Sequence, residues 1–275
     1  IYASADGDVD LYDGEGGVDT LVLDGAGGDV TLDLASELMS SVMFGNDVVQ
    51  GIENVEGTAL NDIIRGDAEA NKLSGNAGDD QLDGRAGNDH LIGAGGADTL
   101  DGGDNDDTLD GGDNDDVLIG GSGNDTLIGG LGANDLDGGI GTDTLDYTGA
   151  LAAVSADLDN DRVLKSSDSQ YDDFSNIENI IGSGFDDDFV LDAGNLAAID
   201  GQFDSISGGG DAGGGDTVEV FGSITFDALE MANVFDNIEN IDFLGSTLDA
   251  GNTEFSISGD DVANMMGASN FLHID

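Results

Sequence analysis

A nine-residue repeat is the feature of this sequence that most restricts its fold. Ten consecutive units run without a gap from Gly57 to Asp146, and glycine opens every one of them. The sixth position is Asp in eight units and Asn in two, and the eighth is Ile in the first unit and Leu in the other nine. Such a period indicates a solenoid, in which small identical elements stack on their neighbours.

The distribution of residues within each unit predicts the shape of the coil. Six turn-forming positions precede a three-residue strand whose middle side chain points inward, so two units make one coil of about 18 residues with a strand on each face. Glycine supplies the positive φ angles of tight corners, and proline, which cannot donate in a strand ladder, is absent from the chain. We therefore expect an all-β protein built on a right-handed parallel β-roll, with additional β-rich segments between roll segments.

Stacking of the coils brings the acidic positions together. Residues 18 apart become neighbours about 4.8 Å apart, which predicts two ladders of side chains. One edge carries Asp62, Asp80, Asp98, Asp116 and Asn134, and the other carries Asn71, Asp89, Asp107, Asp125 and Asp143. Adjacent carboxylates at this spacing repel by about 1 kcal/mol in water and about 3 to 4 kcal/mol at a protein surface. The ladders therefore oppose folding unless a cation neutralises them.

Calcium is the cation that best suits these ladders. It accepts six or more oxygen ligands in flexible geometry, whereas magnesium keeps its waters and zinc prefers Cys or His. The chain has no Cys and only two His. The stacked pairs in residues 57–146 predict about six to eight calcium ions.

The best-formed units match a known pattern. Residues 120–128 read GGSGNDTLI and residues 138–146 read GGIGTDTLD, and both resemble the GGxGxDxUx nonapeptide of the repeats-in-toxin (RTX) proteins. The resemblance implies a parallel β-roll in which each calcium ion lies between loops 18 residues apart. It also implies that the ligands are sixth-position side chains and alternate carbonyls among the first four positions.

Carried over unit by unit, the resemblance implies a set of ligands. Two further units, residues 5–13 and 14–22, add two sixth-position Asp residues to those of the main array. The expected side-chain ligands are Asp10, Asp19, Asp62, Asp80, Asp89, Asp98, Asp107, Asp116, Asp125, Asp143, Asn71 and Asn134. The expected backbone ligands include Gly75, Gly84, Gly93, Gly102, Gly111, Gly120, Gly129 and Gly138. Loops 57–60 and 66–69 lack most of the glycines, and Asn carries no charge, so those sites are expected to be weaker.

An internal duplication organises the rest of the chain. The sequence from Asp19-Thr20-Leu21 to Ile52-Glu53-Asn54 returns from residue 143 to residue 179 at offsets of 124 and 125, and a weaker third copy runs from 216 to 240. We therefore divide the chain into a roll start with a β insert (1–56), the ten-unit roll (57–146), a second insert with a partial roll (147–210) and a degenerate β segment (211–275). Short helices are predicted at residues 35–41, 228–231 and 260–266, and we take the chain to be part of a longer protein.

Charge and hydropathy exclude several classes of partner. The chain has 60 acidic and 5 basic residues, for a net charge of -55, which excludes binding to nucleic acid or to an anionic membrane surface. It has no run of 18 apolar residues, so membrane insertion is not expected. Residues 157–161 with Asp168 imitate an EF-hand loop, but Arg162 replaces its glycine. That segment is either a solvated acidic turn or an isolated, weaker calcium site.

No catalytic constellation is present. The sequence lacks HExxH and GxSxG motifs, and His90 and His273 are far apart, so we expect no enzyme activity. Two functions remain. The first is a calcium-binding extracellular structural module of an adhesin, surface layer or filament, which folds and stiffens on binding calcium outside the cell. The second is a carboxy-terminal RTX export and folding module of a secreted enzyme or toxin.

The resemblance also implies a location and a set of partners. RTX proteins leave the cell through type I secretion channels, so the chain is expected to be secreted, either extracellular or at the cell surface. Its expected partners are calcium and, through calcium, further copies of itself in a homo-oligomer or filament.

Overall fold

The described part of the chain consists of strands, turns and loops. The computed structural model describes residues 1, 10–23, 28–41, 45–158, 160–192, 205–207, 217–221, 235–236, 240–244 and 271–274. No helix occurs among these residues, which confirms the all-β class. The chain divides into two compact units, Ile1–Asp143 and Thr144–Asp275.

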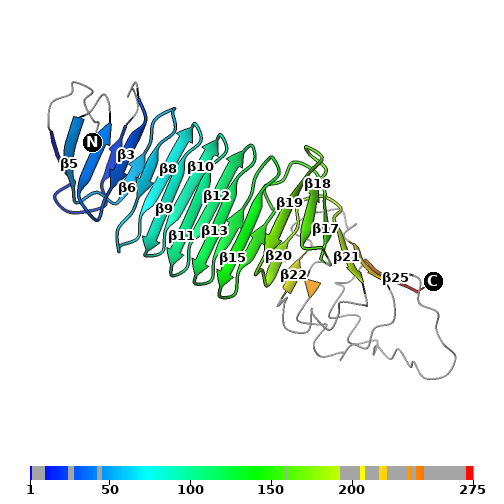
Figure 1. Cartoon of the computed structure of the whole chain (residues 1–275). Helices are drawn as coiled ribbons and strands as arrows, with labels where there is room; N and C mark the ends of the chain where they lie inside the picture. The colour runs from blue at the N-terminus through cyan, green and yellow to red at the C-terminus, as the bar shows by residue number, and fades with distance from the viewer. Residues whose placement is uncertain are drawn as a thin grey trace. The chain divides into compact units, whose positions relative to one another are not determined.

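The first unit contains two sheets that face each other across the roll. Sheet 1 has, in spatial order, β1 (Leu11–Asp13), β5 (Gly45–Gln50), β4 (Leu38–Ser41), β3 (Val30–Asp33), β7 (Ile63–Arg65), β9 (Gln81–Ala86), β11 (Thr99–Asp104), β13 (Val117–Ser122) and β15 (Asp135–Ile140). Sheet 2 has β2 (Thr20–Val22), β6 (Asn54–Glu56), β8 (Lys72–Ala77), β10 (His90–Gly95), β12 (Thr108–Asp113) and β14 (Thr126–Ile128). Figure 1 shows these strands side by side along the roll, in blue to green.

The register of the sheets confirms the predicted coil. Leu91 of β10 pairs with Leu73 of β8 on one side and with Leu109 of β12 on the other, in parallel, and each partner is 18 residues away. In sheet 1, Leu100 pairs with Leu82 in the same way. Successive units therefore alternate between the two sheets, as expected of a parallel β-roll.

The eighth-position side chains form the core of the roll. Their exposed fractions are 0 to 2%: Ile64, Leu73, Leu82, Leu91, Leu100, Leu109, Leu118, Leu127, Leu136 and Leu145. Each contributes about 1.5 to 3 kcal/mol by its burial. The space between the sheets admits one large side chain per unit, so the core is thin.

Most strands of the roll are longer than predicted. The strands β8, β9, β10, β11, β12, β13 and β15 each have six residues, whereas the repeat predicted three. They continue through the first three positions of the following unit, because those positions also pair with the coils on either side. The strands β6, β7 and β14 keep the predicted three residues.

The first insert is an antiparallel meander. Strand β4 pairs antiparallel with both β3 and β5, so the helix predicted at residues 35–41 is wrong. Met39 is buried while Leu38 and Ser40 are exposed, which is the alternation of a strand. Pairing with the two neighbouring strands overrides the local helix propensity. The helices predicted at residues 228–231 and 260–266 lie outside the described residues.

The second unit also has two sheets and an antiparallel meander. Its larger sheet has β19 (Gln170–Ser175), β18 (Arg162–Lys165), β17 (Val154–Asp157), β21 (Asp188–Asp192), β23 (Thr217–Phe221), β25 (Asn240–Leu244) and β26 (Phe271–Ile274). Its smaller sheet has β16 (Thr144–Asp146), β20 (Asn179–Ile181), β22 (Ser205–Ser207) and β24 (Phe235–Asp236). Strands β17, β18 and β19 form an antiparallel meander like that of β3, β4 and β5. The duplication found in the sequence is therefore a duplication of structure.

The segment that imitates an EF-hand loop is the turn of a hairpin. It joins β17 to β18, and within it the Nδ2 of Asn160 donates to the Oδ2 of Asp157 at 2.8 Å. Arg162 lies 2.6 Å from Asp173 on the adjacent strand β19. The acidic segment thus lies at the hairpin between β17 and β18, and whether it binds calcium stays a prediction.

Candidate metal centre

Two ladders of acidic side chains follow the edges of the roll. From Asp62 to Asp125, the main-chain N–H of each sixth-position residue donates to the Oδ1 of the sixth-position side chain 18 residues further on, at 2.7 to 3.0 Å. On one edge the successive members are Asp62, Asp80, Asp98, Asp116 and Asn134. On the other they are Asn71, Asp89, Asp107, Asp125 and Asp143. The stacking order deduced from the repeat is therefore present.

The second oxygen of these carboxylates is buried without a hydrogen bond. The Oδ2 atoms of Asp80, Asp89, Asp98, Asp107 and Asp125 accept no hydrogen bond. The exposed fractions of these residues are only 1 to 3%. A charged oxygen in this position carries a large desolvation penalty unless something else pairs with it. Each such atom therefore requires a proton or a cation.

The pKa values of the ladder carboxyls reflect this burial. Loss of hydration raises the pKa of Asp80 and of Asp107 to about 7, and that of Asp89 to about 6. The hydrogen bond from the preceding coil acts in the opposite direction, and neighbouring carboxylates raise the values of Asp80 and Asp107 further. Burial also raises the pKa of Asp98 and Asp125. These groups resist ionisation until positive charge is supplied.

Glycine at the first position leaves room for oxygen atoms of two coils. A methyl group on the Cα of Gly102 would lie 2.5 Å from the Oδ2 of Asp107 and 2.7 Å from the carbonyl oxygen of Gly120. The same relationship holds at Gly84 with Asp89 and the carbonyl of the next coil. A carboxylate oxygen and a carbonyl oxygen therefore face the same point. A donor set made only of oxygens fits calcium.

Side chains alone do not complete a metal site. Within the described residues, no group of three His, Cys, Asp or Glu side chains has an arrangement that would hold a metal ion. Two ladder carboxylates at most serve any one position between coils. Main-chain carbonyls, such as that of Gly120 near the Oδ2 of Asp107, are further oxygen atoms at these positions.

The two ladder residues nearest the N-terminus have partners that the repeat did not predict. The N–H of Asp10 donates to the Oδ1 of Asp47 at 2.9 Å, and the N–H of Asp19 donates to the Oε2 of Glu53 at 2.8 Å. These partners are 37 and 34 residues away instead of 18, because the meander lies between them. Glu53 belongs to the duplicated Ile-Glu-Asn motif, which is the only sequence feature that pointed to it.

Asp62 differs from the other members of its ladder. Its Oδ1 accepts hydrogen bonds from the N–H of Val30 and the hydroxyl of Thr58, and its Oδ2 accepts one from the N–H of Thr58. Both of its oxygens are therefore occupied by donors of this chain. The sequence placed Asp62 with the calcium ligands and did not single out Thr58.

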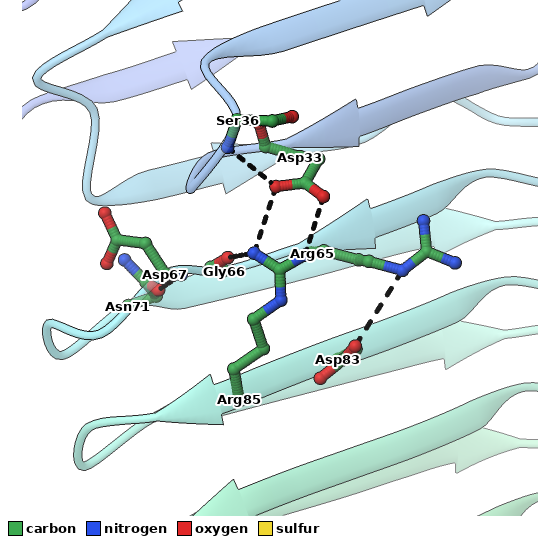
Figure 2. A network of polar contacts seen from close by, with 8 residues as sticks. All are labelled: Asp33, Ser36, Arg65, Gly66, Asp67, Asn71, Asp83 and Arg85. Atoms are coloured by element: carbon green, nitrogen blue, oxygen red, sulfur yellow. Dashed lines mark hydrogen bonds and ion pairs between the residues drawn. The ribbon is translucent and has the colours of Figure 1, made fainter.

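Arg85, from the second coil of the roll, supplies a positive charge to the first coil, residues 57–74. Its guanidinium binds both carboxylate oxygens of Asp33, at 2.6 and 3.0 Å, and donates to the carbonyl of Gly66 at 2.7 Å (Figure 2). Arg65 lies nearby, 3.8 Å from Asp83. The pKa of Asp33 is lowered, chiefly by its hydrogen bonds with Arg85. One of the five basic residues of the chain thus joins the roll to the preceding meander.

The first unit is thus a parallel β-roll: its two sheets face each other, its leucines point inward, and carboxylate oxygens are buried in ladders along its edges. Comparison with known families agrees: residues 56–91, 83–118 and 110–145 each match the model of the RTX calcium-binding nonapeptide repeat, which describes four copies of the nonapeptide. Residues 56–145 therefore consist of RTX calcium-binding nonapeptide repeats. No curated protein matches the chain significantly. The described residues contain no helix that is long and apolar enough to span a membrane.

Proposed function

We propose that this chain is an extracellular structural module whose roll folds and stiffens when calcium fills its ladders. One observation carries the proposal: the Oδ2 atoms of Asp80, Asp89, Asp98, Asp107 and Asp125 are buried and accept no hydrogen bond. A calcium ion between coils offsets their charge and adds carbonyl ligands from both loops. The proposal assigns no catalysis to these residues, since the sequence offers no nucleophile and base in one motif.

Folding and calcium binding are coupled in this proposal. The thin core contributes about one leucine per nine residues, and the unneutralised ladders oppose stacking by about 3 to 4 kcal/mol for each adjacent pair. An ion that binds the folded state and has little affinity for the unfolded chain stabilises the fold by mass action. Because neighbouring coils share ladder residues, binding is expected to be cooperative.

A calcium titration followed by far-ultraviolet circular dichroism tests this coupling. In chelator we expect most of the strand signal to be lost, with a steep return as calcium is added. Magnesium at the same concentration is the control, and it should restore little signal because it does not readily give up its waters. A chelated chain that keeps its full strand signal would contradict the proposal.

The ligand sets favour work outside the cell. Each position between coils has at most two carboxylates, and no sixth-position residue of the repeat is a Glu. Sites of this kind belong with extracellular modules, whose dissociation constants are about 0.1 to 1 mM. Cytosolic calcium is far below this range, so the chain is expected to stay unfolded until export. Isothermal titration that gives a dissociation constant below about 1 μM would contradict this assignment.

The roll followed by a meander occurs twice in the chain, which supports an extended structural role over that of a single terminal export module.

We propose further that calcium promotes association between copies, because it reduces a net charge of -55 and bridges carboxylates. Sedimentation velocity compares the chain in chelator and at millimolar calcium, and larger species are expected only with calcium. A single monomeric species at saturating calcium and high protein concentration would leave a monomeric spacer instead.

A further inference from the structure

The corner loops of the roll occur in two hydrogen-bonding states. In the loop 57–62, the second residue, Thr58, donates its N–H to the Oδ2 of Asp62 at 2.6 Å and its hydroxyl to the Oδ1 at 3.2 Å. The N–H of Val30 adds a third bond to the same carboxylate. We call this the closed state, since the carboxylate is filled by donors of the chain itself.

Two other loops adopt the closed state. In the loop 66–71, the N–H of Asp67 donates to the Oδ1 of Asn71 at 2.8 Å. In the second unit, the N–H of Ser183 donates to the Oδ2 of Asp187 at 2.6 Å, and its hydroxyl donates to the Oδ1 at 2.7 Å. The N–H of Val154 also reaches Asp187, just as Val30 reaches Asp62. The arrangement has therefore formed twice, at equivalent places after each copy of the meander.

The loops that begin at Gly75, Gly84 and Gly93 are in an open state. Their second residues have left-handed backbone angles, with φ of +76° at Asn76, +75° at Arg85 and +78° at Ala94. The strand continues through these residues, as in β8, β9 and β10. The Oδ2 atoms of the Asp residues that close these loops then accept no hydrogen bond. Only an open loop presents a carboxylate oxygen for a cation.

The carbonyl groups of the first coil are also occupied. The Nδ2 of Asn76 donates to the carbonyl of Gly57 at 2.8 Å, and the guanidinium of Arg85 donates to the carbonyl of Gly66 at 2.7 Å. Figure 2 shows Arg85 between Gly66 and Asp33, beside the loop that contains Asp67 and Asn71. These are first-position carbonyls of the closed loops 57–62 and 66–71. Protein donors therefore occupy these two first-position carbonyls as well as side-chain oxygens of Asp62 and Asn71.

We propose that the closed loops 57–62, 66–71 and 182–187 are calcium-independent corners, and that the calcium ladders of the roll begin at Asp80 and Asp89. This inference rests on the proposed function and specifies which loops carry it. It removes the pairs of Asp62 with Asp80 and of Asn71 with Asp89 from the eight stacked pairs, which leaves about six ions for the roll. The first coil then forms a cap on which the calcium-dependent coils stack.

Counting bound ions tests the assignment. Native mass spectrometry at saturating calcium compares the wild-type chain with Asp62→Asn and Asp98→Asn, which remove the same charge from a closed and an open loop. Asn71 already accepts an N–H in a closed loop, but Asn at position 62 would replace one of two accepting oxygens by an amide nitrogen, so a second variant accompanies it. We expect Asp62→Asn to keep the full number of ions and Asp98→Asn to lose up to two, because Asp98 belongs to two stacked pairs. Loss of ions from Asp62→Asn equal to that from Asp98→Asn would overturn the inference.

A second variant covers the case in which Asp62→Asn does not fold. Thr58→Val removes only the hydroxyl donor and keeps the shape and the N–H. It is expected to bind as many ions as the wild type, with a calcium midpoint raised by less than about threefold. If Thr58→Val loses ions, the loop 57–62 is a calcium site and the inference is wrong. A wild-type chain that binds no calcium would instead refute the proposed function itself, so the two failures are distinguishable.

Discussion

The main-chain N–H of Asp80 donates to the Oδ1 of Asp98 at 2.7 Å, across one coil of the roll. The bond gives the ladder a direction, because the Oδ1 of Asp80, Asp89, Asp98, Asp107 and Asp125 accepts an N–H from the coil before it, while the Oδ2 of each accepts no hydrogen bond. A ladder carboxylate therefore has two separable roles, as a hydrogen-bond acceptor and as a charge.

The first prediction separates charge from hydrogen bonding. Asp98 and Asn134 both accept an N–H from the preceding coil through Oδ1, so replacement of either by Ala removes that bond. Only Asp98→Ala also removes a carboxylate that two mid-roll positions share. We expect its calcium midpoint, measured by circular dichroism, to rise at least about tenfold, equivalent to about 1.4 kcal/mol, and that of Asn134→Ala to rise much less. Equal shifts would mean that the pairing at 18 residues does not govern binding.

The second prediction concerns pH in the absence of calcium. The pKa of Asp80 and of Asp107 is about 7 in the folded roll and 3.8 as the ordinary value, so between these limits the folded chain binds more protons than the unfolded chain. These two carboxyls therefore stabilise the fold most below about pH 4, and their contribution is lost as the pH rises through 7. Acidification in chelator should increase the strand signal. No change between pH 7.5 and 4.5 would be inconsistent with buried ladder carboxyls.

With calcium present, the effect of pH on binding has the opposite direction. Protons and calcium compete for the same carboxylates, so the calcium midpoint should rise as the pH falls from 7.5 to 5.5. Titrations at several pH values measure both effects in one set of samples.

The third prediction tests the space at the first position. Gly102→Ala places a methyl group against the Oδ2 of Asp107 and the carbonyl of Gly120, and overpacking of this kind costs about 1 to 3 kcal/mol. Gly16→Ala is the control, because nothing lies within 4 Å of the added methyl group, and its effect should stay within about 0.5 kcal/mol. Urea unfolding at saturating calcium measures both. An unaffected Gly102→Ala variant would mean that the two oxygens do not converge at this point.

The fourth prediction compares two arginines of the first coils. Arg85→Ala removes a bidentate ion pair with Asp33 and a bond to Gly66, which should lower the free energy of unfolding by about 1 to 2 kcal/mol. Ala is compatible with the backbone there, since Ala94 has a similar φ at the equivalent position. Arg65→Ala removes only an exposed contact of 3.8 Å with Asp83 and should change stability by at most about 0.5 kcal/mol. Equal effects in urea unfolding would argue against the bridge between the meander and the roll.

The sequence by itself determined the repeating part of this protein. The period placed Leu73, Leu91 and Leu109 in one column and Asp80 and Asp98 in one ladder, and both arrangements are present in the structure. The prediction succeeded because an in-register parallel stack turns a fixed sequence spacing directly into contact in space. The need for a cation followed from the same spacing, since it fixes the distance between charges.

Only the tertiary structure decided how the repeat is interrupted and where it ends. Three features depend on residue pairs that follow no regular spacing in the sequence. They are the strand β4 in place of a helix, the bond between Asp10 and Asp47, and the closed state of the loop at Asp62. The N–H of Val30 reaches Asp62 across 32 residues of meander, and no local pattern encodes that contact. A repeat specifies the contacts between its own units, whereas the donors that satisfy its ends come from whichever segments the chain folds against them.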